Sequence, residues 1–393
     1  MYRSRREPRT CPAAKAILAA LLGAALRATA QEPPAAPPPA AAPAAPPKWY
    51  EEIAVNGMAS VSWSYNLNRP ASGTNQYRVF DFDDNSIKVD VVDLVVQKSV
   101  SKAGDAGFRV DAAAGASIPR MTAASGLFRD PATGKAEDFD LQQAYVSWIA
   151  PVGNGLRLDA GKFFTIAGYE FVDRWDGYND NATRSFQFGY AEPVTHTGLK
   201  ASYAFSDTVS ALVLVANGWD VVKDNNSSKS LGAGLTVTPG PAATFSVAYL
   251  YGPEQAGNNS DNRGLLNVIA TLKPSDVVTV GFNLDWGTEQ GLAPGGETAT
   301  WWGVTGYLRT NLSKTFALVL RAEHFDDADG VRTGTRQKLE EVTLTPELRA
   351  GAHLVFRADL RVDFSNEPVF EDRDGAFTKK QQPTVLLNAL YLF

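Results

Sequence analysis

Apolar and polar residues alternate along most of the chain after residue 48. The stretches are about ten residues long and are separated by residues that form turns. One face of segment 53–66 carries Val55, Gly57, Ala59, Val61, Trp63 and Tyr65, and the other carries Asn56, Ser60, Ser62, Ser64 and Asn66. Because side chains in a strand point to opposite faces in turn, this period of two predicts extended strands with one apolar face.

The same pattern recurs through to the last residue. It predicts strands at 53–66, 86–99, 107–117, 138–149, 155–164, 195–206, 208–219, 229–238, 242–251, 263–272, 276–286, 299–309, 314–325, 337–345, 349–364 and 383–393. The strand at 349–364 has the cleanest alternation, with Arg349, His353, Arg357, Asp359, Arg361 and Asp363 on its polar face.

The connections between these strands alternate between short and long. Tight turns are expected at 206–207, 239–241, 273–275 and 311–313, and long polar loops at 67–85, 118–137, 165–194, 220–228, 252–262, 287–298, 326–336 and 365–382. A water-soluble sandwich also has alternating strands, but this asymmetry of short turns and long loops is typical of a barrel that crosses a membrane.

We therefore predict an all-β fold, a transmembrane antiparallel β-barrel of about sixteen strands with short periplasmic turns and long extracellular loops. No run of eighteen apolar residues follows residue 30, which argues against helical membrane spans. Strands inside lipid must pair all their backbone groups, so the sheet must close into a ring. Trp219, Trp286, Trp301 and Trp302 lie at predicted outer strand ends and Trp148 near an inner end, where aromatic girdles belong.

The final strand ends on an aromatic residue. Val385, Leu387, Ala389, Tyr391 and Phe393 share one face, and chain ends in soluble domains usually fray into water. This ending resembles the C-terminal strand of bacterial outer-membrane proteins, which implies that the barrel-assembly machinery recognises Tyr391 and Phe393.

The first thirty residues have the pattern of a secretory signal peptide. A basic stretch that includes Arg3 and Arg9 precedes the apolar run 16–26, and Ala28-Thr29-Ala30 matches a cleavage site of small residues. We expect a signal peptide at 1–30, an Ala/Pro-rich periplasmic linker at 31–48 and an outer-membrane β-barrel at 49–393. The protein would thus be exported through the periplasm.

Charge and cysteine content narrow the possible partners. The formal net charge is −6 for the whole chain, and it becomes more negative once the basic N-terminal stretch is removed. An acidic protein argues against nucleic acid as a partner. The single cysteine is Cys11, inside the predicted signal peptide, so the mature chain is expected to have no disulfide and no cysteine metal site.

Several motifs in the middle of the chain resemble one protein family. They are Ala144-Tyr-Val-Ser-Trp148, Pro151-Val-Gly-Asn-Gly-Leu-Arg-Leu-Asp-Ala-Gly-Lys-Phe163, Gly168-Tyr-Glu170, Thr183-Arg-Ser-Phe186 and His196-Thr-Gly198. They are similar to those of the OmpL-like β-barrel porin family, and the resemblance extends more loosely from about Trp49 to Phe393. It implies a porin-like channel in the outer membrane. It assigns no catalytic or binding residues.

The charged residues of the predicted lumen suggest how such a channel discriminates between ions. In general porins the third long loop folds inward, and 165–194 is similar in position and length. This loop carries Glu170, Asp173, Asp176 and Asp180, with Arg174 and Arg184. Arginines on the predicted inner wall are Arg109, Arg157, Arg309, Arg321, Arg349, Arg357 and Arg361, with Asp111, Asp159 and Glu323 nearby. An acidic loop facing a basic wall predicts a charged constriction.

Enzymatic chemistry finds little support in the sequence. His196, His324 and His353 are the only histidines, and none lies near a serine in a nucleophile setting. Asp326-Asp-Ala-Asp-Gly330 lacks the spacing of a calcium loop. We therefore predict no catalytic residues, no cofactor and no metal site.

Our prediction is a porin for passive diffusion of small hydrophilic solutes and ions. The alternatives are a substrate-specific channel, in which Tyr169, Phe171, Trp175 and Tyr178 guide a sugar or another solute, and a plugged structural or adhesive barrel. The expected partners are outer-membrane lipid and lipopolysaccharide, the barrel-assembly machinery, and other copies of the chain in a homotrimer by analogy with general porins.

Overall fold

The computed structural model describes residues 48–119 and 136–393. Within these ranges the chain forms one barrel unit that begins at Lys48. The predicted signal peptide, most of the linker and most of loop 118–137 lie outside the described residues. Among those that are described, no helix combines the length and the apolar character needed to cross a membrane.

Sixteen strands make up the barrel. They are β1 (Ile53–Asn66), β2 (Ser86–Lys98), β3 (Ala106–Ala114), β4 (Phe139–Ala150), β5 (Leu156–Phe164), β6 (Thr195–Ala204), β7 (Val209–Ala216), β8 (Ser230–Gly240), β9 (Ala243–Pro253), β10 (Asn262–Leu272), β11 (Val278–Ala293), β12 (Glu297–Asn311), β13 (Phe316–Asp327), β14 (Gln337–Ala350), β15 (Leu354–Ser365) and β18 (Gln381–Leu392). A 3₁₀ turn, η1 (Trp49–Glu52), precedes β1, and a π-helical turn, η2 (Gln187–Ala191), follows β5. The hairpin β16 (Phe370–Glu371) and β17 (Phe377–Lys379) forms a separate two-stranded sheet.

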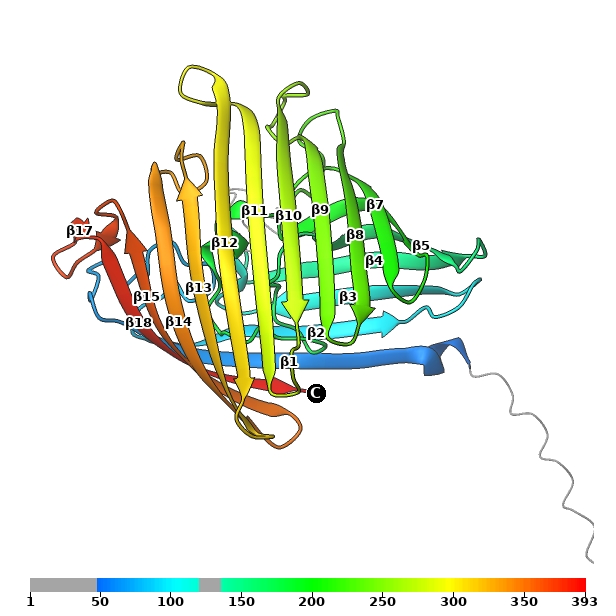
Figure 1. The fold of residues 1–393 in the computed structure, drawn as a ribbon, viewed down its shortest axis with the longest axis horizontal. Helices are drawn as coiled ribbons and strands as arrows, with labels where there is room; N and C mark the ends of the chain where they lie inside the picture. Colours follow the sequence, from blue (N-terminus) through cyan, green and yellow to red (C-terminus); the bar gives the residue numbers. More distant parts are fainter. Residues whose placement is uncertain (1–47, 120–135) are drawn as a thin grey trace, which may run out of the picture. The chain divides into compact units, whose positions relative to one another are not determined.

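Every strand pairs antiparallel with its neighbours, and the ring closes between β1 and β18 (Figure 1). In this seam the backbone N–H of Gly57 donates to the carbonyl of Phe393 at 2.8 Å, and the N–H of Phe393 donates to the carbonyl of Gly57 at 2.9 Å. The last residue is therefore tied into the barrel instead of fraying. Tyr391 and Phe393 both remain about half exposed on the outer face, with their rings stacked at 6.4 Å.

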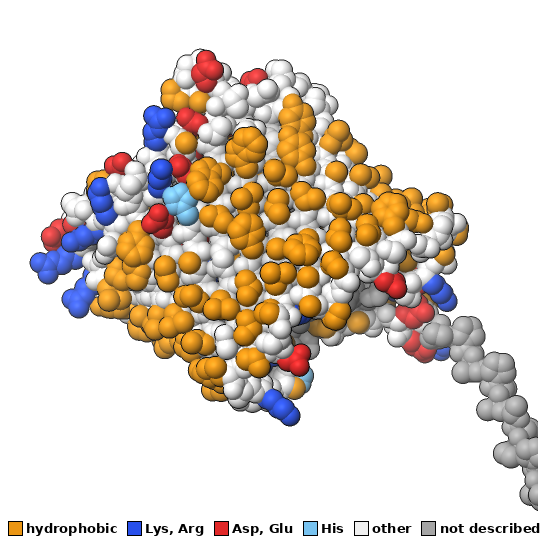
Figure 2. All heavy atoms as spheres, in the orientation of Figure 1, with side chains coloured by type: hydrophobic (Ala, Val, Ile, Leu, Met, Phe, Trp, Pro, Cys, Tyr) orange, Lys and Arg blue, Asp and Glu red, His pale blue; other side chains and the backbone are white. Residues whose placement is uncertain are grey.

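The barrel buries polar side chains and exposes apolar ones, which is the opposite of the arrangement in a soluble protein. In β1, Ser60, Ser62, Ser64 and Asn66 are buried, whereas Val55 and Val61 are exposed. Figure 2 shows apolar side chains spread over the wall formed by β8 to β14, with charged side chains gathered at its margins. A surface of this kind fits lipid and not water, because monomers in water rarely expose apolar patches of such extent. The sequence prediction of a transmembrane barrel with about sixteen strands is confirmed.

The strand boundaries were predicted wrongly in two regions. The predicted loop 287–298 is mostly strand: β11 reaches Ala293 and β12 begins at Glu297, and Gly295 and Gly296 have positive φ in the tight turn between them. Beyond the membrane both faces of a strand can be polar, so alternation no longer marks it. The predicted strand 349–364 is in fact two strands, because Arg349 and Ala350 end β14 and a turn at 351–353 precedes β15. Arg349 and His353 therefore do not belong to one ladder with Arg357 and Arg361.

The tryptophans divide into two groups. Trp148, Trp286 and Trp302 face outward and are about half exposed, as girdle residues should be. The prediction was wrong for Trp219 and Trp301, which are buried in contact with each other inside the barrel. Because successive residues of β12 alternate between the two faces, Trp302 faces lipid while Trp301 faces the lumen.

Candidate functional site

The connection 165–194 between β5 and β6 turns into the barrel, and we call it the inward loop. Its backbone and side chains bond to strands distant in the sequence. The N–H of Gly168 donates to Asn267 Oδ1 at 3.1 Å, Gln187 Nε2 donates to Asp285 Oδ2 at 2.7 Å, and Trp301 Nε1 donates to the carbonyl of Ala191 at 3.1 Å. The loop is thus held against the wall formed by β10 to β12.

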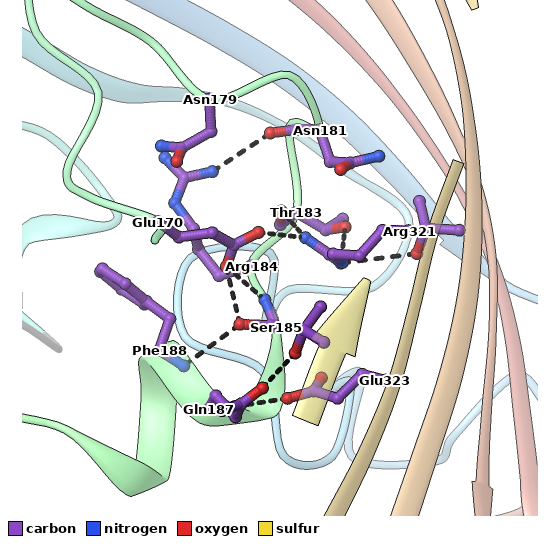
Figure 3. Close-up of polar contacts among 12 residues, drawn as sticks. Glu170, Asn179, Asn181, Thr183, Arg184, Ser185, Gln187, Phe188, Arg321 and Glu323 are labelled. Carbon is purple, nitrogen blue, oxygen red and sulfur yellow. Dashed lines mark hydrogen bonds and ion pairs between the residues drawn. The ribbon is translucent and has the colours of Figure 1, made fainter. Parts of the chain in front are cut away.

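Arg321, on β13, is fully buried and links the wall to the loop (Figure 3). Its guanidinium donates to Glu170 Oε1 at 2.6 Å, to the Thr183 carbonyl at 2.7 Å and to Glu341 Oε1 at 2.6 Å. The other oxygen of Glu170 accepts from the N–H and the hydroxyl of Ser185 at 2.7 and 2.8 Å. Charge-assisted bonds of this kind, shielded from water, are strong and directional.

A carboxylate of the wall orients the helical turn of the loop. Glu323 on β13 accepts the backbone N–H groups of Phe186 and Gln187, both at 2.6 Å (Figure 3). These are N–H groups at the start of η2 that have no partner within the turn. On β15, Asp359 accepts the N–H of Thr183 at 2.7 Å in the same way.

Three more wall arginines meet three different acids of the loop. Arg357 on β15 pairs with Asp173 at 3.0 Å, Arg109 on β3 with Asp176 at 2.8 Å, and Arg309 on β12 with Asp180 at 2.6 Å. Together with Arg321 and Glu170, four loop carboxylates are each matched to a different strand.

These pairs change the electrostatic expectation. The sequence suggested a field across an open gap between an acidic loop and a basic wall. In the structure the two charged surfaces are in direct contact and largely neutralise each other. The charges therefore hold the loop in place in addition to lining the lumen.

The remaining predicted arginines differ from one another. Arg361 is buried, donates to the carbonyl of Arg184 in the loop and pairs with Asp363 at 2.6 Å. Among the described residues, Arg157 and Arg349 form no hydrogen bond or ion pair with the inward loop. Each pairs with a carboxylate of the wall, Asp159 at 2.9 Å and Glu347 at 3.1 Å, and each side chain remains substantially exposed, at 39 and 47 %.

A second connection, which the sequence analysis did not predict, also enters the lumen. In loop 67–85, Arg78 is fully buried and pairs with Asp363 at 2.7 Å. It also pairs with Asp81 of its own loop and donates to Thr384 Oγ1 at 3.0 Å. The available signal was the run Tyr77-Arg78-Val79-Phe80, which is unusually apolar for an outer loop.

The aromatic residues of the inward loop differ in their contacts, and two of them pack onto the wall. Tyr169 stacks on Tyr307 with ring centroids 4.2 Å apart, and Tyr178 lies under the guanidinium of Arg357 at 5.5 Å. Phe171 contacts Arg174 at 5.1 Å. Trp175 is partly buried, and its indole N–H lacks a hydrogen-bond partner in the described part of the chain. Two of the four aromatic residues predicted to guide a solute, Tyr169 and Tyr178, are thus in contact with the wall.

Apolar side chains fill much of the lumen at the level of the loop. One cluster includes Phe163, Phe186, Leu265, Trp301 and Phe325, and a second includes Met58, Val91, Ile118, Val172 and Phe188. Between the loop and the wall of β1, β2 and β18 lies a cavity of about 30 Å³, lined by Ser60, Ser62, Asp90, Asp173, Arg184 and Asn388 among others. That volume holds about one water molecule.

The three histidines are accounted for by local bonds. His196 is buried and lies 3.1 Å from both Thr165 Oγ1 and the Gly218 carbonyl. His324 contacts Glu340, and His353, predicted to face the lumen, lies in the turn 351–353 beside Tyr391. In the predicted acidic loop, Asp327 accepts backbone N–H groups of Arg332 and Thr333. Within 48–119 and 136–393 no group of three or more His, Cys, Asp or Glu residues is placed to hold a metal ion.

Comparisons with known proteins agree with this geometry. The sequence profile of the family described as "Putative beta-barrel porin-2, OmpL-like" matches residues 52–393. A search of curated proteins finds no match.

Several solved structures share the fold. The outer membrane channel DcaP of Acinetobacter baumannii has 11% identity and a TM-score of 0.59, over 87% of this chain and 97% of that one. An anion-selective porin from Comamonas acidovorans has 11% identity and a TM-score of 0.59, over 87% and 99% of the two chains. Salmonella typhi OmpF, in complex with daunomycin, has 10% identity and a TM-score of 0.54, over 87% and 97%.

Proposed function

The chain belongs to the OmpL-like β-barrel porin family, and on this premise we propose that the inward loop is the gate and selectivity element of its diffusion channel. The protein is an integral outer-membrane porin, a channel for passive diffusion. The observation that carries the proposal is the set of four ion pairs by which the loop is held to four different strands.

The solutes are small and hydrophilic. The buried inner faces of the strands are rich in Ser, Thr, Asn and charged residues, which suit water and ions. At the loop the passage is narrow, so the protein conducts ions and small solutes at a low rate with the loop in place, and larger solutes only when the loop is displaced.

We expect a weak anion preference. The buried pairs cancel most of the lumen charge, which leaves the exposed guanidiniums of Arg157 and Arg349 to act on passing ions. Buried Arg357 and Arg361 contribute by holding the loop. Their replacement by Glu is therefore expected to raise conductance as well as cation preference.

The test is conductance of the refolded mature protein in a planar bilayer under a salt gradient. Persistent discrete steps with a reversal potential of anion-selective sign are expected. The R157Q/R349Q double variant is expected to move this potential toward zero, and an unmoved potential would remove both residues from the ion path.

A plugged structural barrel is the second candidate. The observation in its favour is the packing of apolar clusters through the lumen at loop level. A silent bilayer, with folding confirmed independently by heat-modifiable gel mobility, would select this alternative.

Other features of the protein remain proposals. We propose that residues 1–30 are removed as a signal peptide, that 31–48 is a periplasmic linker, and that the short turns face the periplasm. The pairing of Phe393 with Gly57 supports Tyr391 and Phe393 as an assembly signal, because this strand closes the ring. Contacts with lipopolysaccharide and a homotrimer are also proposed; a structural neighbour, OmpT of Vibrio cholerae, has a trimer form.

A further inference from the structure

We propose that the inner wall of β5 to β10 binds organic carboxylates that carry an apolar body, through Arg157. This deepens the proposed function, on which it rests for the route to the site. The site is a cavity of about 480 Å³, which lies in the range of small-molecule pockets. Its described lining includes Arg157, Ile166, Ser202, Leu212, Thr236 and Ile269.

The cavity opens into the lumen and not into lipid. Val213, Leu235 and Val247 point outward and are exposed, so their neighbours Leu212, Thr236 and Ser246 point inward. The cavity lies toward the end of the barrel with the short turns, since Ser202 and Ser210 flank the turn that joins β6 to β7. Ile166, at the start of the inward loop, contributes to its lining.

Arg157 is the single charged residue among the described residues that line the cavity. Its Nε bonds to Asp159 at 2.9 Å and its Nη2 to Ser147 Oγ at 3.2 Å, while its Nη1 donates to no described group. Asp159 is buried and also lies 3.5 Å from Lys200 Nζ. Two cations against one carboxylate leave a net positive charge, so an anion is favoured.

The hydroxyl groups supply further donors. Ser202, Ser210, Thr236 and Ser246 come from four adjacent strands, and Thr236 and Ser246 lie 3.0 Å apart through their hydroxyl oxygens. A carboxylate held by a guanidinium accepts readily from such groups.

The apolar lining distinguishes this site from a plain water-filled wall. Ile166, Leu212 and Ile269 are only partly buried although they face the lumen. Small ions have no apolar surface to bury against these side chains, and sugars have little. An apolar ring or short alkyl chain that covers these side chains is stabilised because apolar surface is removed from water. The combination of one guanidinium, several hydroxyls and an apolar floor therefore matches an aromatic or short-chain carboxylate.

The experiment measures block of the salt current by three probes: benzoate, acetate with the same charge and no ring, and benzyl alcohol with the same ring and no charge. We expect benzoate to act at concentrations at least about tenfold lower than either of the others. R157Q is expected to weaken benzoate block by about tenfold or more, because a hydrogen bond to a charged group is lost. R349Q is the matched control, since Arg349 is similarly exposed and paired and also acts on passing ions, but lies outside this cavity. It is expected to shift the reversal potential and to leave the ratio of benzoate block to acetate block unchanged.

A second variant tests the contribution of the apolar side chains that line the cavity. I269S should retain sensitivity to carboxylates and lose the preference for benzoate over acetate. Equal block of wild type and R157Q by benzoate, or equal loss in R157Q and R349Q, would overturn the proposal.

Binding of benzoate to the protein in detergent micelles, by saturation-transfer NMR, separates this proposal from the channel itself. If the bilayer is silent but micellar binding depends on Arg157, the carboxylate site stands and the channel proposal fails. If the protein conducts but neither measurement shows a preference for benzoate, the channel stands and the carboxylate site fails.

Discussion

At the residue scale, the protein uses buried arginines to connect a loop to a barrel wall. Arg321 has no exposure and three strong acceptors, whereas Arg349 has one acceptor and is half exposed. Burial decides the energetic difference, because a buried charge left unpaired is costly and a surface pair contributes little.

R321Q is therefore expected to destabilise the folded barrel by about 3–5 kcal/mol, since Glu170 and Glu341 would lose their cation. R349Q should change the stability by at most about 1 kcal/mol. Urea unfolding in lipid vesicles, followed by tryptophan fluorescence, compares the two. Equal effects would show that the buried pair is not the main link.

The ion pair of Asp173 has a defined pH dependence. Burial acts to raise the pKa of Asp173, but Arg184 and Arg357 outweigh it and hold the pKa below its usual value. A lowered folded-state pKa contributes stability above the unfolded pKa of about 3.9, and this is lost as the pH falls through the folded value. At pH 7, D173N is expected to lower the temperature at which the folded band on a gel converts to the unfolded band. This difference in temperature from wild type should shrink below about pH 4. A difference that persists unchanged at pH 3 would contradict this assignment.

At the scale of elements, two glycines of the family motifs allow neighbouring strands to approach. Gly161 on β5 pairs with Gly198 on β6. A Cβ at Gly198 would lie 2.1 Å from the Val215 carbonyl oxygen, and one at Gly161 would lie 2.2 Å from the Ala144 carbonyl oxygen. Backbone atoms of a barrel cannot easily give way, which explains glycine in both motifs.

G198A is therefore expected to destabilise the barrel by about 1–3 kcal/mol, the usual cost of overpacking. Gly306 on β12 provides the control, because a Cβ there meets nothing within 4 Å. Urea unfolding of both variants in vesicles checks the prediction. If G306A loses as much stability as G198A, the close approach of β6 and β7 is not the cause.

At the scale of the whole molecule, conduction depends on whether the inward loop moves. Asn181 Nδ2 donates to Thr345 Oγ1 at 2.7 Å, so these two side chains link the loop to β14. The only cysteine of the chain is Cys11, in the predicted signal peptide, so a new disulfide in the mature protein would have no competing thiol.

The double variant N181C/T345C is expected to restrict the flux of larger solutes when oxidised and to recover on reduction, because the disulfide would hold the loop in place with its apolar side chains packed against the wall. Liposome swelling with sugars of increasing size measures this flux. Each single cysteine variant serves as a control. Equal swelling in the oxidised and reduced states would show that the loop stays in place during transport.

Features of the fold could be predicted from the sequence where they depend on interactions between residues close together in the chain. Strand positions, the alternation of short turns and long loops, and the membrane-facing surface follow from a local period of two, so they were predictable for segments such as 53–66 and 263–272. The period fails where a strand leaves the membrane, as at 287–298, and where two strands meet in a turn without a break in alternation, as at 350–354.

The sequence by itself determined the closed membrane barrel and the two faces of its strands, because these depend on alternation along single strands. Only the tertiary structure decided which charges meet. Arg321 and Glu170 are far apart in the chain, as are Arg78 and Asp363, and the sequence pattern does not specify the path of a loop. The physical reason is that the pairing of a loop with a wall is set by where the barrel closes and how much space it encloses, and both are properties of the whole ring.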